Sequence, residues 1–332
     1  MGSAPQYRHG DGRRRAGRWR RAALAVLITG AVVVPLSGAV RPQTPAPAPA
    51  SLAPLSASTL HEAYAANRAN AAEAARTAAA HHDRDRAATD RRLAAPARHL
   101  LRFDGRGSGR VTEVLGDLAR ADRVAVLVPG SDTGLDTYGR FHAAAAALHR
   151  QLARQAPAGT RTAVVAWLGY ETPGTVSTTV TTTGRAEQAA PHLRALVADL
   201  RAIAGAGPRI SLLCHSYGSV VCGRAAAGLA VDDIALVGSP GTGADSAARL
   251  HTRARVWAAR GGDDWVENVP HVDLDLFGTT VGFGTDPVSP SFGARVFTAG
   301  DGGHSDYFRP GSASLTNLAR IVLGETKAVT HD

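Results

Sequence analysis

The segment that most clearly indicates catalytic chemistry is residues 214–218, of sequence Cys-His-Ser-Tyr-Gly. It follows an apolar run at 210–213 and precedes a stretch from Ser219 that is typical of a helix. A strand, a tight turn with serine at its apex and a helix make a nucleophile elbow, which lifts the serine Oγ above a sheet. The pattern predicts that Ser216 is a nucleophile. An ordinary serine in a strand-to-helix turn is the alternative, and Cys214 stands where the usual pattern has glycine.

A nucleophilic serine needs a base, and the base needs a third group to orient it. When the chain order is serine, acid, histidine, the acid follows the second strand after the elbow and the histidine follows the last strand. Asp264 follows an expected strand at 254–259 and is the predicted acid. His304 lies in a Gly-rich loop after an expected strand at 294–298 and is the predicted base.

Two other acids compete with this assignment. Asp263 precedes the predicted acid directly and is the alternative for its role. Asp286 precedes Pro287, a pairing typical of a turn. We expect it to be a turn residue first and a pocket residue second.

An oxyanion site requires two backbone N–H groups aimed at the developing charge. The N–H of Tyr217, just after the nucleophile, is one candidate. The loop at 129–134 supplies the other, with Ser131 as the preferred donor and Asp132 as the next choice. We expect His215 to point away and pack against the sheet, without a role in catalysis. No phosphate-binding glycine motif is present, so nucleotide binding is unsupported.

Cys214 and Cys222 are the only cysteines of the chain. They flank the elbow, so a disulfide that locks it is one interpretation and two small packed side chains is the other. A third or fourth ligand for zinc is missing, so we expect no metal site and no cofactor.

The elements around these residues alternate between strands and helices. A pair of antiparallel strands is expected first, at 99–103 and 109–116. Further strands are expected at 123–128, 162–168, 210–213, 233–237, 254–259 and 294–298, and helices at 138–155, 185–203, 219–229 and 312–323. This order predicts an α/β fold with a mainly parallel sheet covered by helices on both faces. The loop after residue 237 is too short for a large cap domain, whereas 267–290, and the Thr-rich loop at 175–183, could shape a pocket.

The N-terminus has the composition of an export signal. Seven arginines and one acid in residues 1–21 precede an apolar run at 22–34 and small residues ending at Ala39. Pro35 favours cleavage after Ala39. Residues 22–40 would alternatively span a membrane as a retained anchor, with the arginines in the cytoplasm. The protein is therefore expected to be exported, either secreted or held at the outer face of the cytoplasmic membrane.

Four regions follow from composition: a signal peptide or anchor at 1–40, a Pro/Ala-rich linker at 41–57, an Ala-rich helical segment at 58–97 and a folded domain at 98–326. The formal net charge of +9 is concentrated in the leader, which contributes +6. The remaining charge shows no basic stripe, so no nucleic-acid partner is expected.

Several blocks together resemble a known family. They are Val-Leu-Val-Pro-Gly-Ser-Asp-Thr at 126–133, Trp-Leu-Gly-Tyr at 167–170, Leu-Cys-His-Ser-Tyr-Gly-Ser at 213–219, Val-Gly-Ser-Pro-Gly at 237–241 and Ser-Phe-Gly-Ala at 291–294. The chain over about 99–325 resembles an actinobacterial family of α/β hydrolases classified mostly as a domain of unknown function. This resemblance implies the α/β-hydrolase fold and a triad of Ser216, Asp264 and His304, but no substrate.

These observations predict an exported serine hydrolase of the esterase or lipase type, acting on a small-molecule or lipid ester. Acyl transfer to a cell-envelope acceptor uses the same residues and is one alternative. A catalytically silent envelope-binding protein is another, against which the complete set of Ser216, Asp264 and His304 weighs. The oligomeric state and the acyl-chain length stay open.

Overall fold

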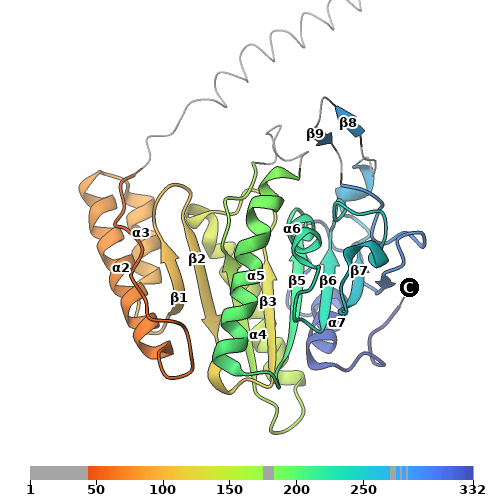
Figure 1. Ribbon diagram of the computed structural model, residues 1–332, viewed down its shortest axis with the longest axis horizontal. Coiled ribbons are helices and arrows are strands. Elements are labelled where there is room, and N and C mark those ends of the chain that lie inside the picture. The colour runs from red at the N-terminus through yellow and green to blue at the C-terminus, as the bar shows by residue number, and fades with distance from the viewer. Residues whose placement is uncertain (1–43, 175–182, 270–273, 277–278, 282, 332) are drawn as a thin grey trace, which may run out of the picture. The chain divides into compact units, whose positions relative to one another are not determined.

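One large sheet organises the protein (Figure 1). The computed structural model describes residues 44–174, 183–269, 274–276, 279–281 and 283–331. The sheet has eight strands in the order β1-β2-β4-β3-β5-β6-β7-β10. They are β1 (His99–Asp104), β2 (Arg110–Leu115), β3 (Arg123–Val128), β4 (Thr162–Leu168), β5 (Arg209–His215), β6 (Asp233–Val237), β7 (Arg255–Ala259) and β10 (Arg295–Val296). β2 runs antiparallel to both of its neighbours and all other pairs are parallel. The antiparallel pair of β1 and β2 and the mainly parallel sheet were predicted, whereas the antiparallel pairing of β2 with β4 was not.

Helices cover both faces of the sheet. The α4 helix (Tyr138–Gln155) and α7 (Ala313–Leu323) bury apolar side chains against one face. The α5 helix (Gly184–Ala204) and α6 (Gly218–Ala225) cover the other. Alternate residues of β3 belong to the two core layers: Val124 and Val126 lie in the layer that contains α5 and α6, and Leu127 lies in the layer that contains α4 and α7. A central strand buried on both sides must be apolar throughout, which explains the continuous apolar run of β3.

The expected helical segment at 58–97 is two helices, α2 (Leu60–Ala80) and α3 (Arg84–Leu93). The chain turns at His82, whose φ is +61°, and Asp83 then caps the second helix by accepting a hydrogen bond from the Arg86 N–H. A capping aspartate satisfies an N–H that the first turn of a helix leaves without a partner. The predicted helical composition was therefore right, but the break at Asp83 was not foreseen.

The α2 helix lies against β1 and does not stand off from the sheet. Asn67 is buried there, and its Nδ2 donates to the carbonyl oxygens of Leu100 and Leu101 at 3.2 and 2.9 Å. The β1–β2 register shifts at this point, between Leu100 and Arg102. A bulge frees backbone groups from the ladder, and the amide of Asn67 provides a donor for them.

The helix after the elbow is shorter than predicted. It ends at Ala225 instead of Leu229. Arg194 of α5 donates to the carbonyl oxygens of Arg224 and Ala225, which a longer helix would have used internally. An arginine at a helix C-terminus also interacts favourably with the dipole, so this contact stabilises the early end.

One excursion of the described chain follows β7, at the carboxyl end of that strand. The segment predicted as a flap contains a short hairpin of β8 (Leu274–Leu276) and β9 (Thr279–Val281). The connection from β6 to β7 holds only a short 3₁₀ turn at Ala247–Leu250, so no large cap domain is inserted there. The Thr-rich loop predicted at 175–183 falls almost wholly outside the described residues.

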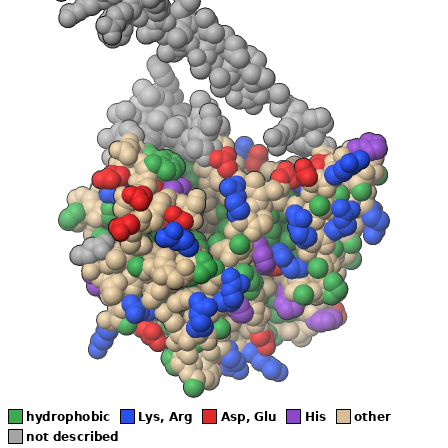
Figure 2. Space-filling view, turned by 180° about the vertical axis from the view of Figure 1, so that it is seen from behind, with side chains coloured by type: hydrophobic (Ala, Val, Ile, Leu, Met, Phe, Trp, Pro, Cys, Tyr) green, Lys and Arg blue, Asp and Glu red, His purple; other side chains and the backbone are tan. Residues whose placement is uncertain are grey.

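The predicted export signal at 1–40 also lies outside the described residues. Within the part that the structure does describe, no helix has the length and apolar character needed to cross a bilayer. On the face seen in Figure 2, basic and acidic side chains are interspersed.

Candidate active site

Ser216 occupies a strained turn between β5 and α6. Its φ is +53°, in a region that non-glycine residues rarely adopt, and its N–H donates to the Val237 carbonyl at 3.0 Å. Gly218 is required just after it, because a Cβ atom there would lie 2.6 Å from the carbonyl oxygen of Val128. Strain of this kind persists only where the surrounding structure imposes it. The predicted nucleophile elbow therefore has its expected geometry.

Cys214 and Cys222 form a disulfide across the elbow, which decides between the two interpretations of the sequence. Their Cα atoms are 6.4 Å apart and both residues are fully buried. The bridge joins the end of β5 to α6 on either side of Ser216. Cys214 thus takes the place of the usual glycine and makes a covalent link there.

Asp264 and His304 meet, although they are distant along the chain. The Nδ1 of His304 lies 2.9 Å from Oδ1 of Asp264. The Asp264 side chain is fully buried and that of His304 is 15% exposed. Because a carboxylate accepts, Nδ1 carries the proton and Nε2 of the neutral ring is left as a base. The loops after β7 and β10 bring these two residues together, as the sequence predicted.

The two competing acids are placed elsewhere. Asp263 is exposed, unlike its neighbour. Asp286 pairs with Arg260 at 2.6 Å, and its Oδ1 accepts from the Val288 N–H in a turn. The expectation that Asp286 is a turn residue is therefore met.

The loop after β3 passes directly beside Ser216. A Cβ atom on Gly130 would lie 3.1 Å from Ser216 Oγ, so the loop backbone is close to the nucleophile. Ser131 follows it, and no acceptor among the described residues takes its N–H. Tyr217 and Ser131 both line the cavity that contains Ser216. The two predicted oxyanion donors are thus on the same cavity wall as the serine.

His215 does not point away from the site, contrary to expectation. Its Nε2 lies 2.7 Å from the carbonyl oxygen of His304, so it must be the donor. Its ring centroid lies 4.8 Å from that of His304 and 5.7 Å from that of Tyr307. A histidine next to the nucleophile carries no sequence signal for this contact, which depends on a residue 89 positions away.

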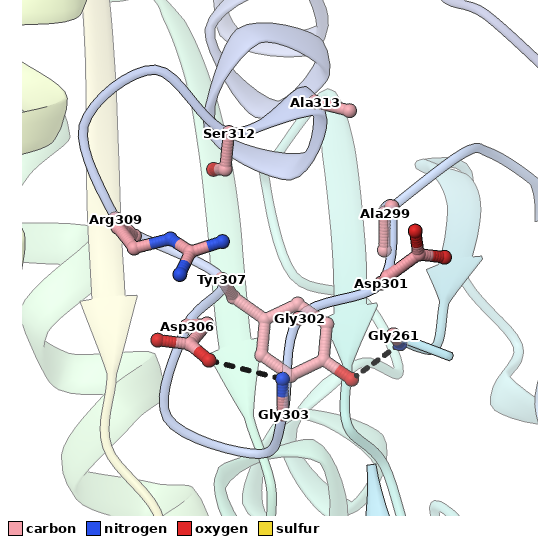
Figure 3. Close-up of a pocket in the computed structure, with 11 residues that line it drawn as sticks. Gly261, Ala299, Asp301, Gly302, Gly303, Asp306, Tyr307, Arg309, Ser312 and Ala313 are labelled. Carbon is pink, nitrogen blue, oxygen red and sulfur yellow. Dashed lines mark hydrogen bonds between the residues drawn. The ribbon is translucent and has the colours of Figure 1, made fainter. Parts of the chain in front are cut away.

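Tyr307 was also missed by the sequence analysis. Its hydroxyl accepts from the Gly261 N–H at 3.0 Å (Figure 3). The same hydroxyl donates to Oδ2 of Asp264. It lies three residues after His304 in the same loop. Its proximity to His304 in the sequence was the one signal that could have indicated a contact with the triad, because no sequence motif identifies a buried tyrosine at such a position.

The electrostatics of Asp264, Tyr307 and His215 differ. Burial raises the pKa of the Asp264 carboxyl, but hydrogen bonds from His304, Tyr307 and the Val266 N–H outweigh it and lower this pKa. Burial, followed by the contact with Asp264, raises the pKa of Tyr307. Burial and the neighbouring His304 lower the pKa of His215 to about 4. At neutral pH the acid is therefore ionised, while Tyr307 and His215 are neutral.

The site opens into a cavity of about 910 Å³. Much of its wall is apolar, and Asp132 and Arg140 are the charged side chains among the residues that line it. Trp265 lies at this cavity with its ring centroid 4.7 Å from that of His304, and it is 52% exposed. Among the described residues no cluster of three metal-binding side chains is present.

A family model described as alpha/beta hydrolase matches residues 104–274. The chain belongs to the α/β-hydrolase family. Its topology agrees with this family, as the resemblance of the sequence blocks implied. Membership supports hydrolase activity, while the bond that is cleaved depends on the site.

This α/β hydrolase also matches two uncharacterised proteins of Mycobacterium tuberculosis, from strains CDC 1551 and H37Rv. Each is 31% identical over 256 residues, which cover 68% of the chain. The chain spans only 39% of the length of these curated relatives.

Solved structures with a similar arrangement include esterase PE8, at 18% identity and a TM-score of 0.41. That match covers 63% of this chain and 95% of the other. A serine hydrolase without a lid from Xanthomonas campestris is 16% identical with a TM-score of 0.39, covering 66% and 88%. A predicted CIB-like hydrolase from Thermoplasma acidophilum is 16% identical with a TM-score of 0.42, covering 70% and 97%.

Proposed function

We propose that this protein is an exported serine hydrolase that cleaves acyl esters through an acyl-enzyme intermediate. One observation carries the proposal. Ser216, strained at the apex of the elbow, lines the same cavity as His304, whose Nδ1 is hydrogen-bonded to the buried carboxylate of Asp264. A nucleophile, a base and an orienting acid are the groups that acyl transfer to serine requires.

In the proposed first step, Ser216 Oγ attacks the ester carbonyl carbon and its proton passes to Nε2 of His304. The N–H groups of Tyr217 and Ser131 stabilise the oxyanion. The proton then moves from His304 to the leaving alkoxide, which departs as an alcohol. Water, deprotonated by the same Nε2, attacks the acyl-enzyme; the bond to Ser216 Oγ breaks, Nε2 returns the proton to that oxygen and the acid is released. Asp264 keeps the proton on Nδ1 and stabilises the imidazolium throughout.

The lining of the cavity supports a substrate with an apolar acyl group. Phe141 and Ala144 of α4, together with Pro240 and Phe308, line the cavity that contains Ser216. A concave apolar wall with a few convergent polar groups is the usual form of a small-molecule site. Apolar surface buried by an acyl chain contributes about 0.8 kcal/mol per methylene. A lipid or small-molecule ester therefore fits better than a highly polar one.

Export is proposed from the sequence of the N-terminus. The arginine-rich leader and the apolar run at 22–34 support secretion or anchoring at the outer face of the membrane. The disulfide is consistent with an oxidising compartment.

The test is labelling of the full chain by a fluorophosphonate probe, with Ser216→Ala and His304→Ala as variants. We expect labelling and turnover of p-nitrophenyl esters that are lost in both variants. A well-folded wild-type protein that neither labels nor hydrolyses any ester of the series would overturn the proposal. Retention of a bound ligand by Ser216→Ala, without turnover by the wild type, would indicate a binding protein instead.

A further inference from the structure

Tyr307 lies at the point where the loops of the acid and the base meet. It follows His304 in the loop after β10, is 3% exposed, and reaches the loop after β7 through two hydrogen bonds of its hydroxyl. The hydroxyl accepts from the N–H of Gly261 (Figure 3) and, outside the residues drawn there, donates to Oδ2 of Asp264. One side chain therefore ties together the backbone and the carboxylate of the acid loop.

The two oxygens of Asp264 have different partners. Oδ1 accepts from Nδ1 of His304 and from the N–H of Val266, each at 2.9 Å. Within the described residues, Tyr307 is the side-chain donor to Oδ2. Without that hydroxyl, Oδ2 would be a buried anionic oxygen that lacks a hydrogen bond, which is costly.

On the side of β6 there is no room for another side chain that could donate to Oδ2 of Asp264 in place of Tyr307. Gly238 has a φ of +55°, and a Cβ atom on it would lie 2.8 Å from Oδ2 of Asp264 and 2.9 Å from the Tyr307 ring. The backbone of Gly238 thus packs directly against the Asp264 carboxylate and the Tyr307 ring. The carboxyl torsion of aspartate is broad and roughly two-fold, so packing and hydrogen bonds must set it.

We infer that Tyr307 is a positioning residue for the triad, which fixes the rotation of the Asp264 carboxylate so that Oδ1 faces His304. The inference rests on the proposed function, in which Asp264 orients the base. A misdirected carboxylate would leave the imidazole in varying orientations, and small errors of geometry at a reacting centre reduce rate strongly.

The test compares Tyr307→Phe with Tyr138→Phe in the full chain. Tyr138 is a matched control, because its hydroxyl is buried and donates to a buried carboxylate, that of Glu113, at 2.8 Å. It is not among the residues that line the Ser216 cavity. Each variant loses one hydrogen bond from a tyrosine to a buried carboxylate. A general loss of stability should therefore affect both variants, whereas an effect on the triad should appear only in Tyr307→Phe.

For Tyr307→Phe we expect kcat per fluorophosphonate-reactive site to fall roughly tenfold or more, with KM changed less than twofold. For Tyr138→Phe we expect kcat within twofold of the wild type. Equal kcat values for the two variants would overturn the inference and leave the proposed function intact.

A second readout does not depend on turnover. The downfield proton resonance of His304 Nδ1–H, assigned by its loss in His304→Ala, should move or broaden in Tyr307→Phe and stay in place in Tyr138→Phe. An unchanged resonance in Tyr307→Phe would contradict the inference. If the wild type is inactive towards esters, the proposed function fails and this resonance still decides the role of Tyr307.

Discussion

Gly130 lies directly against Ser216: a Cβ atom at position 130 would fall 2.6 Å from Ser216 Cβ and 3.1 Å from its Oγ. Cβ atoms do not approach one another this closely, so the contact requires glycine. The absence of a side chain lets the loop after β3 pass over the nucleophile. It thereby places the backbone of Ser131 on the wall of the cavity beside the serine.

A methyl group at position 130 should therefore impair the reaction. We expect Gly130→Ala to lower kcat/KM by roughly 100-fold, the size of effect seen when one oxyanion donor is lost. Gly207→Ala is the control, since a Cβ atom there meets nothing within 4 Å. Ester turnover by both variants checks this, and wild-type activity of Gly130→Ala would contradict the assignment of the loop.

Replacing each of the two neighbouring aspartates distinguishes their roles. Asp264→Asn should reduce kcat by about 10⁴-fold, because the amide favours the wrong tautomer of His304. Asp263→Asn removes an exposed charge and should leave kcat within twofold. Steady-state kinetics of the pair measures the difference. A larger loss in Asp263→Asn than in Asp264→Asn would refute the predicted acid.

The disulfide should contribute to the stability of the elbow. Its chain-entropy contribution for a sequence separation of 8 is about 2.5 kcal/mol. We expect the double variant Cys214→Ala/Cys222→Ala to lose roughly that amount, seen as a lower urea midpoint. Reductant should destabilise the wild type and have no effect on the variant. Equal midpoints for wild type and variant would show that packing alone holds the elbow.

His215 should make stability depend on pH between about 4 and 6.5. Its pKa in the folded protein is about 4, lowered by burial and by His304, and it is about 6.5 when unfolded. In this range the unfolded chain binds a proton that the folded one does not, so the free energy of unfolding falls as the pH falls. Above pH 6.5 the contribution is complete and constant.

The variant His215→Gln keeps a donor but does not titrate in this range. We expect its free energy of unfolding to fall less steeply from pH 6.5 to 4, by at most about 1.4 kcal/mol per pH unit relative to the wild type. Urea titrations at several pH values measure both slopes. Parallel curves would show that His215 takes up its proton equally in both states.

Much of the fold could be predicted because its signals are local. The apolar runs of β3 to β7 and the order of strands and helices follow from periodicity along the chain. The break at Asp83 was overlooked, although an aspartate that caps a helix is a local signal. The early end of α6 at Ala225 could not be predicted, because it depends on Arg194 from another helix. Helix ends respond to partners that a local pattern does not contain.

The same division holds for the candidate site. The sequence by itself determined the elbow around Ser216 and the loops that carry Asp264 and His304, since strand order places such loops at one edge of a parallel sheet. Asp263 and Asp264 are identical in type and adjacent, so only burial and a hydrogen bond across the fold distinguish them. The disulfide, the inward position of His215 and the contact of Tyr307 with Asp264 were likewise decided by tertiary structure. Each depends on the distance between atoms of different elements, which the packing of the sheet and its loops sets.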